Sequence, residues 1–181
     1  GWTAAMAVLT GDAPDLEGSV GVTGVPSGVQ AGVAFYPPTD FLEMDAWAVK
    51  KCEPPRFHDD AASPESRLVG CAIQTCAEKA QAANPLRYVS PADPPLLILH
   101  GGSDPLVPHN QSEHLYMALN KACREAAFIS LPRAGHGPWN GFLTDDALRE
   151  AATIRTTRTA GCAVTNPTPY TPTWQTVIDF L

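Results

Sequence analysis

The sequence of 181 residues is poor in basic residues and contains no cluster of them. Lys and Arg number 12 against 19 Asp and Glu, which gives a formal net charge of −7. Because no run of five or more Lys or Arg occurs, neither nucleic acid nor an anionic membrane surface is an expected partner. No apolar stretch approaches the roughly 18 residues of a membrane span, so the sequence predicts no transmembrane segment. It also contains no internal repeat.

The five cysteines lack the spacing of a zinc site, because no C-x2-C pair occurs and no histidine pair at ligand spacing lies beside them. We expect neither a metal nor an organic cofactor. So many cysteines favour disulfides in an exported, extracellular protein. Cys71 and Cys76 can pair locally or either can reach Cys52, and Cys123 can pair with Cys162. One cysteine is then left free or bonded to a segment outside this sequence.

The sequence does contain enough apolar material for one globular domain, with 44% hydrophobic and 17% charged residues. Short β-rich runs alternate with helical patterns along the chain. The predicted strands are Val29–Tyr36, Leu96–His100 and the run AAFISLP. The predicted helices are Trp2–Leu9, a helix starting at SPES, Cys76–Ala83, PHNQSEHLYMALNKACRE, TDDALREAA and the C-terminal TPTWQTVIDFL. This alternation predicts an α/β fold, a mostly parallel sheet flanked by helices.

Chemically useful side chains follow the ends of these strands, where α/β proteins place their functional groups. Asp104 follows the second strand and His136 follows the third, with one helix between them. In this order they fit the acid and the histidine of a Ser-His-Asp hydrolase. Taken singly, Asp104 is also typical of a Ser-Asp-Pro turn and His136 of an ordinary loop histidine. Asp40, after the first strand, is interpreted as a helix cap.

The other histidines have simpler interpretations. His100 stands at the end of a strand and is expected to be structural, hydrogen-bonded to the loop beyond it. His58, His109 and His114 are interpreted as surface residues.

Several stretches resemble the α/β-hydrolase superfamily, in the branch of carboxylesterases, acetyl esterases and feruloyl esterase-like proteins. LLILHGGSDPLVPHNQSEHLYMAL followed by ISLPRAGHG is similar to its acid and histidine segments. VQAGVAFYPPTDF resembles the strand and loop before the lid, and ESRLVGCAIQTCAEKAQAANPLRYVSPADPP resembles the stretch after it. The likeness covers roughly residues 1–143 and the last helix. It implies one domain over 1–181, the C-terminal portion of this fold, with a lid-like segment at about 38–66 and an insertion at about 150–170.

The nucleophile of that superfamily is missing, because no G-x-S-x-G motif is present. GWTAAMAVLT is similar to the helix that follows the serine in this branch, so Gly1 corresponds to the last glycine of the motif. We therefore expect an upstream segment or chain to carry the serine.

The resemblance implies a serine esterase that cleaves a small-molecule ester, with Asp104 and His136 in the triad. Apolar side chains near these loops are candidates for the substrate pocket, although ordinary packing explains them as well. They are Trp139, Phe41, Met44 and Trp47. Two other functions remain open: a serine peptidase of the prolyl-oligopeptidase type, and a non-catalytic binding protein with the hydrolase fold.

Overall fold

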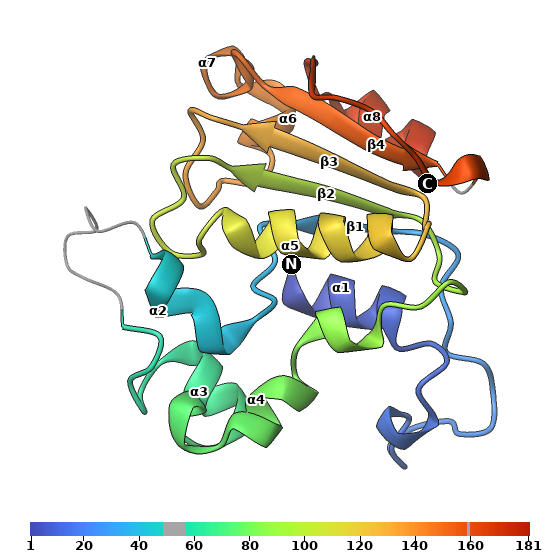
Figure 1. Cartoon of the computed structure of the whole chain (residues 1–181), viewed down its shortest axis with the longest axis vertical. Coiled ribbons are helices and arrows are strands. Elements are labelled where there is room, and N and C mark those ends of the chain that lie inside the picture. Colours follow the sequence, from blue (N-terminus) through green and yellow to red (C-terminus); the bar gives the residue numbers. More distant parts are fainter. Residues whose placement is uncertain (49–56, 159) are drawn as a thin grey trace.

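The computed structural model describes residues 1–48, 57–158 and 160–181, which form an α/β fold around one sheet (Figure 1). The strands are β1 (Gly32–Phe35), β2 (Leu96–Gly101), β3 (Ala126–Leu131), β4 (Thr153–Arg158), β5 (Ala163–Val164) and β6 (Thr168–Pro169). Their order is β1-β2-β3-β4-β5, with β6 also paired to β4. The first three strands are parallel, and β4 runs antiparallel to β3. The predicted fold class is confirmed.

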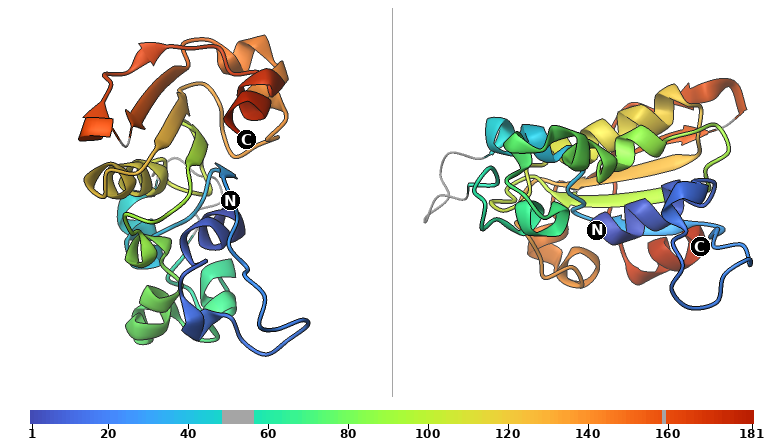
Figure 2. Two further views of the ribbon diagram at one scale, coloured as in Figure 1. Left: turned by 90° about the vertical axis from the view of Figure 1, so that its right-hand side faces the viewer. Right: turned by 90° about the horizontal axis from the view of Figure 1, so that it is seen from below.

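Helices cover both faces of this sheet (Figures 1 and 2). They are α1 (Trp2–Leu9), α2 (Met44–Trp47), α3 (Pro64–Val69), α4 (Ala77–Ala82), α5 (Asn110–Lys121), α6 (Gly141–Thr144), α7 (Asp146–Arg149) and α8 (Trp174–Phe180). Side chains alternate between the two faces of a strand. In β2, Leu96 and Ile98 pack with α1 and α5, whereas Leu97 and Leu99 pack with α6 and α8.

A second layer of short helices lies below the sheet in Figure 1. It contains α2, α3, α4 and four-residue or shorter 3₁₀ turns, η2 (Phe41–Glu43), η3 (Ile73–Thr75) and η4 (Pro85–Tyr88). Another 3₁₀ turn, η1 (Pro14–Leu16), lies in the loop after α1, and η5 (Ala160–Cys162) precedes β5. Residues 49–56 of the predicted lid-like segment, with Cys52, lie outside the described residues.

The start of α3 follows from its sequence. The Ser63 side chain accepts a hydrogen bond from the Ser66 backbone N–H at 3.0 Å, and Pro64 occupies the first helical position. Glu65 is thereby fixed in the first turn. Gly70 ends the helix with a positive φ of 81°, a conformation that glycine adopts without steric cost.

Three strands escaped the sequence analysis, which expected an insertion at about 150–170: β4 and the two-residue strands β5 and β6. Residues Thr153–Arg158 form β4, with Phe128 opposite Arg155 and Ile129 opposite Ile154. The stretch TIRTTR lacks the apolar run of β2 and β3 because most of its side chains are only partly buried. Threonine suits such half-exposed strands, but a polar run of six is a weak signal.

Two disulfides join parts of the fold: Cys71 to Cys76, and Cys123 to Cys162. Both pairings are among those that the sequence allows. The second ties the end of α5 to the segment between β4 and β5.

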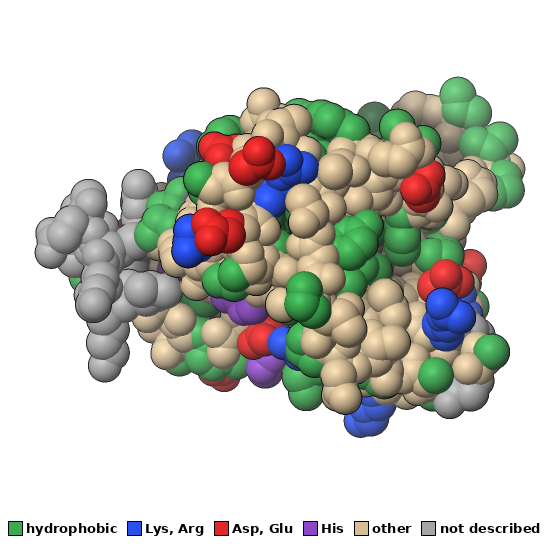
Figure 3. Space-filling view, turned by 90° about the horizontal axis from the view of Figure 1, so that it is seen from above, with side chains coloured by type: hydrophobic (Ala, Val, Ile, Leu, Met, Phe, Trp, Pro, Cys, Tyr) green, Lys and Arg blue, Asp and Glu red, His purple; other side chains and the backbone are tan. Residues whose placement is uncertain are grey.

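Charged side chains are dispersed over the surface. On the face in Figure 3, basic and acidic side chains lie side by side. Among the ion pairs of the structure are Arg133 with Glu150 and Arg149 with Asp146. In the described part of the chain, no helix is both long enough and apolar enough to cross a membrane.

Candidate active site

Asp104 lies in the loop that follows β2 and is buried. Its Oδ1 accepts hydrogen bonds from the backbone N–H groups of Leu106 at 2.8 Å and Val107 at 2.9 Å. Its Oδ2 lies 2.8 Å from Nδ1 of His136 and 3.3 Å from Nε2 of His100. Four donors therefore surround one carboxylate, which fixes its orientation.

His136 lies in the loop that follows β3, at the same edge of the sheet. The two loops are bonded to each other: the Gly102 N–H donates to the Leu131 carbonyl at 2.8 Å, and the Ser103 N–H to the Ala134 carbonyl at 3.0 Å. A side chain at Gly101 would collide with the Ala134 carbonyl, so glycine is required there. The close approach of the loops brings Asp104 and His136 together, although 32 residues separate them.

The ionisation of Asp104 reflects this environment. Burial alone would raise the pKa of Asp104, but the hydrogen bonds from His100, His136, Val107 and Leu106 outweigh that effect. The net result is a pKa well below the usual range of aspartate. Asp104 is therefore a carboxylate at neutral pH, as an acid that stabilises an imidazolium must be.

His100 is a buried neighbour of Asp104 and holds its carboxylate in place. Its Nε2 faces two acceptors, Oδ2 of Asp104 and the Val107 carbonyl at 3.0 Å, so Nε2 carries the proton. Its Nδ1 then accepts a hydrogen bond from the Ser112 hydroxyl at 2.6 Å. The contact with Val107 agrees with the predicted structural role of His100.

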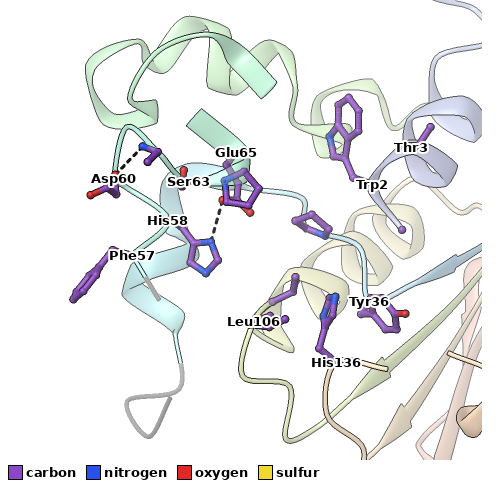
Figure 4. Close-up of a pocket in the computed structure, with 15 residues that line it drawn as sticks. Trp2, Thr3, Tyr36, Phe57, His58, Asp60, Ser63, Glu65, Leu106 and His136 are labelled. Atoms are coloured by element: carbon purple, nitrogen blue, oxygen red, sulfur yellow. Dashed lines mark hydrogen bonds and ion pairs between the residues drawn. The ribbon is translucent and has the colours of Figure 1, made fainter. Parts of the chain in front are cut away.

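An open cavity of about 620 Å³ lies in front of His136 (Figure 4). Its walls come from the start of α1, the end of β1, the segment 57–65 and the loop after β2. The Tyr36 ring lies against the imidazole, with 4.1 Å between the ring centroids. Burial and the nearby charge of Asp104 raise the pKa of Tyr36, so its phenol stays neutral at physiological pH. The sequence analysis did not identify Tyr36, which merely ends an apolar run.

The four predicted pocket residues lie elsewhere in the described structure, and none of them lines this cavity. Phe41 and Met44 are buried in a cluster with Ile73, Ala80 and Val107. Trp47 packs on His114 with 4.4 Å between ring centroids, and Trp139 packs edge-on against Trp174. Their contact with a substrate therefore stays a prediction. Asp40 does cap a helix, because its Oδ1 accepts from the Leu42 N–H at 3.2 Å.

Two of the three histidines assigned to the surface are not there. His58 is buried and its Nδ1 lies 3.1 Å from Oε2 of Glu65, which is also buried. His109 is partly buried and its Nε2 lies 2.9 Å from the Ser130 hydroxyl. Burial and the neighbouring His100 lower the pKa of His109 to about 4. Only His114 is exposed as expected. The correction for His109 depends on a contact with β3, which a local sequence pattern does not reveal.

No group of three or more His, Cys, Asp or Glu side chains in residues 1–48, 57–158 and 160–181 could hold a metal ion. The site thus offers a carboxylate, an imidazole directed into a cavity and a neighbouring phenol. The imidazole, held by the carboxylate, can accept and return a proton next to a bound substrate.

Comparisons with known proteins point to esterases. The family model BD-FAE matches residues 1–119. A bifunctional GH43-CE protein of Bacteroides eggerthii is similar in structure, with a TM-score of 0.67 and 31% identity over 77% of this chain. A truncated form of a carbohydrate esterase from gut microbiota has a TM-score of 0.65 and 32% identity over 76% of this chain. An uncharacterised peptidase of Bacillus subtilis, YuxL, is 41% identical over 59 residues, or 33% of this chain.

The chain spans only part of each of these proteins. It covers 20% of the Bacteroides protein, 49% of the truncated esterase and 9% of the peptidase. The sheet strands β1, β2 and β3 with the helices on both faces therefore form a partial α/β-hydrolase fold.

Proposed function

Because the chain belongs to the BD-FAE family of esterases, we propose that it forms part of a serine esterase cleaving small-molecule carboxylic esters. In this proposal Asp104 is the acid and His136 the general base of the triad. The observation that carries it is the 2.8 Å contact between Nδ1 of His136 and the buried Oδ2 of Asp104, at the mouth of a cavity.

The geometry supports the following sequence of steps. The Nδ1–H of His136 stays bonded to Asp104, which leaves Nε2 free of its proton and able to accept one. Nε2 takes the proton of a serine hydroxyl while the serine oxygen attacks the ester carbonyl. His136 then gives that proton to the departing alkoxide, which leaves as the alcohol. His136 then takes a proton from water, whose oxygen attacks the acyl-serine carbonyl. The bond to the serine oxygen breaks, His136 returns the proton to that oxygen, and the carboxylic acid is released.

We assign the serine to a protein segment that precedes Gly1. Of the serines and threonines in the described cavity wall, Ser63 is committed to capping α3 and Thr3 lies on the exposed side of α1. β1 is the outermost strand of the sheet on this side. A further strand paired with β1 would end beside the cavity, where Gly1 lies so close to the Phe35 carbonyl that a side chain at this position would collide with it.

The test is hydrolysis of a chromogenic short-acyl ester by the protein expressed from its whole reading frame. We expect turnover by the wild type and its loss in His136→Ala, with roughly 10³-fold or more lower kcat/KM. Undiminished turnover in the variant would remove His136 from the triad. An inactive but folded wild type that still binds esters would favour the non-catalytic binding protein.

A serine peptidase is the second candidate, and the similarity to the Bacillus peptidase over 59 residues favours it. The same acid and histidine serve both reactions. Aminoacyl arylamides separate the two functions: a peptidase cleaves them with a kcat/KM comparable to that for esters, whereas an esterase leaves them nearly intact. The two disulfides support the further proposal that the protein is exported.

A further inference from the structure

A second buried carboxylate, outside the proposed triad, lines the same cavity. Glu65 lies in the first turn of α3 and is only 8% exposed. It stands with His58 on the wall formed by the segment 57–65, whereas His136 and Tyr36 lie on the side of the sheet (Figure 4). A substrate bound between the two walls would have its ester at His136 and another part of its structure near Glu65.

The carboxylate of Glu65 has few partners. Its Oε2 forms an ion pair with Nδ1 of His58 at 3.1 Å, but this oxygen receives no well-aligned hydrogen bond. No hydrogen bond to Oε1 is found among the described residues either. A carboxylate offers about four acceptor positions, and leaving them empty in a buried site is costly. A buried acceptor without a protein donor calls for an explanation, and a hydrogen bond from a bound ligand is one that fits a cavity wall.

The surrounding charge indicates what kind of ligand fits. Burial would lower the pKa of His58, but its close contact with Glu65, the charge of Asp45 and the Leu106 carbonyl together raise it. His58 already lies against one oxygen of Glu65, so the pair attracts an ammonium group less than a lone carboxylate would. No Lys or Arg lines the described cavity wall, so an anionic group finds no counter-charge. A neutral donor such as a hydroxyl group suits the free acceptor positions.

We propose that Glu65, oriented by His58, accepts a hydrogen bond from a substrate hydroxyl group remote from the scissile ester, and so selects hydroxylated esters. The inference rests on the proposed esterase function. The hydroxyl group belongs either to the alcohol portion or to the acyl portion of the ester, and both present the same chemistry to Glu65. His58 is a positioning residue in this scheme.

The experiment compares matched ester pairs on the full-length protein. One pair is 4-hydroxycyclohexyl acetate and cyclohexyl acetate, which tests the alcohol portion. The other is methyl 4-hydroxycinnamate and methyl cinnamate, which tests the acyl portion. We expect the wild type to hydrolyse the hydroxylated member of one pair with the higher kcat/KM. Glu65→Gln should reduce this preference by roughly tenfold, while the kcat/KM for the unhydroxylated member hardly changes. Glu78→Gln, the same exchange on the exposed side of α4, serves as the matched control.

Each outcome bears on the proposal separately from the esterase function. Equal loss on both members of a pair would reduce Glu65 to a structural residue, and a wild type without preference in either pair would also overturn the subsite. Failure of the esterase function is seen instead as no hydrolysis of any ester. If Glu65→Gln does not fold, the subsite is tested by product inhibition of the wild type, which requires no variant. Cyclohexane-1,4-diol must then inhibit more strongly than cyclohexanol, or 4-hydroxycinnamate more strongly than cinnamate, and equal inhibition within both pairs contradicts the subsite.

Discussion

Two histidine–carboxylate pairs face one cavity, and they differ in how the carboxylate is satisfied. Asp104 is surrounded by four donors, two backbone N–H groups and two imidazoles. Among the described residues, Glu65 has one ion-pair contact, with His58. The first pair is completed by the fold itself, which suits a group that must hold one orientation during proton transfer. The second pair retains acceptor capacity, which suits a group that binds something from outside.

The shifts in ionisation follow the same difference. Around Asp104 the donors outweigh burial, so it is the carboxylate whose pKa falls. In the second pair it is the histidine whose pKa rises, because Glu65 and Asp45 favour the charged imidazole. An imidazole lies beside a carboxylate in both places, but the surroundings favour the charged carboxylate in the first pair and the charged imidazole in the second.

The largest expected contrast between the pairs is in turnover. Asp104→Asn keeps the shape of the side chain but replaces a carboxylate oxygen with an amide group that donates hydrogen bonds. This amide would face Nδ1 of His136 and Nε2 of His100, which both donate as well. We expect roughly a 10⁴-fold lower kcat for ester hydrolysis by the full-length protein, as for other triads with this exchange. His58→Asn should lower kcat by less than roughly tenfold, because His58 touches no reacting atom. Comparable losses in the two variants would mean that the pairs share one catalytic role.

Stability should show the second contrast. Asp104→Asn disturbs a carboxylate with four donors, and we expect it to cost about 3 kcal/mol of unfolding free energy. Glu65→Gln removes one ion-pair partner and relieves a carboxylate with unused acceptors, so we expect a cost of about 1 kcal/mol. Urea unfolding of both full-length variants measures the difference. A larger cost for Glu65→Gln would mean that Glu65 is as fully satisfied as Asp104.

The first pair could be found in the sequence and the second could not. Asp104 and His136 each follow an apolar run, and parallel strands bring such loops to one edge of the sheet. His58 and Glu65 belong to a segment without regular hydrophobic periodicity. The Ser63 cap predicts that Glu65 lies in a first helical turn, but its burial depends on how 57–65 packs over the loop after β2. Similarly, β4 is missed because most of its side chains are polar and only partly buried. Phe41 and Met44 are apolar whether they line a pocket or fill a core.

The smallest expected contrast is in how stability depends on pH. The folded-state pKa of His58 is raised above its unfolded value, and the groups that face the ring are Glu65, Asp45 and the Leu106 carbonyl. The stabilisation from this pair is therefore fully present below a pH of about 6.5 and is lost as the pH rises through the raised folded value. For Asp104 the sign is opposite, because its folded-state pKa is lowered. The stabilisation from Asp104 is fully present above about pH 3.9 and is lost only in stronger acid. Unfolding free energies of the wild type and His58→Asn between pH 5 and 9 measure the first effect. The gap between the two proteins should narrow toward alkaline pH, and a constant gap would show that His58 stabilises the fold by packing rather than by its charge.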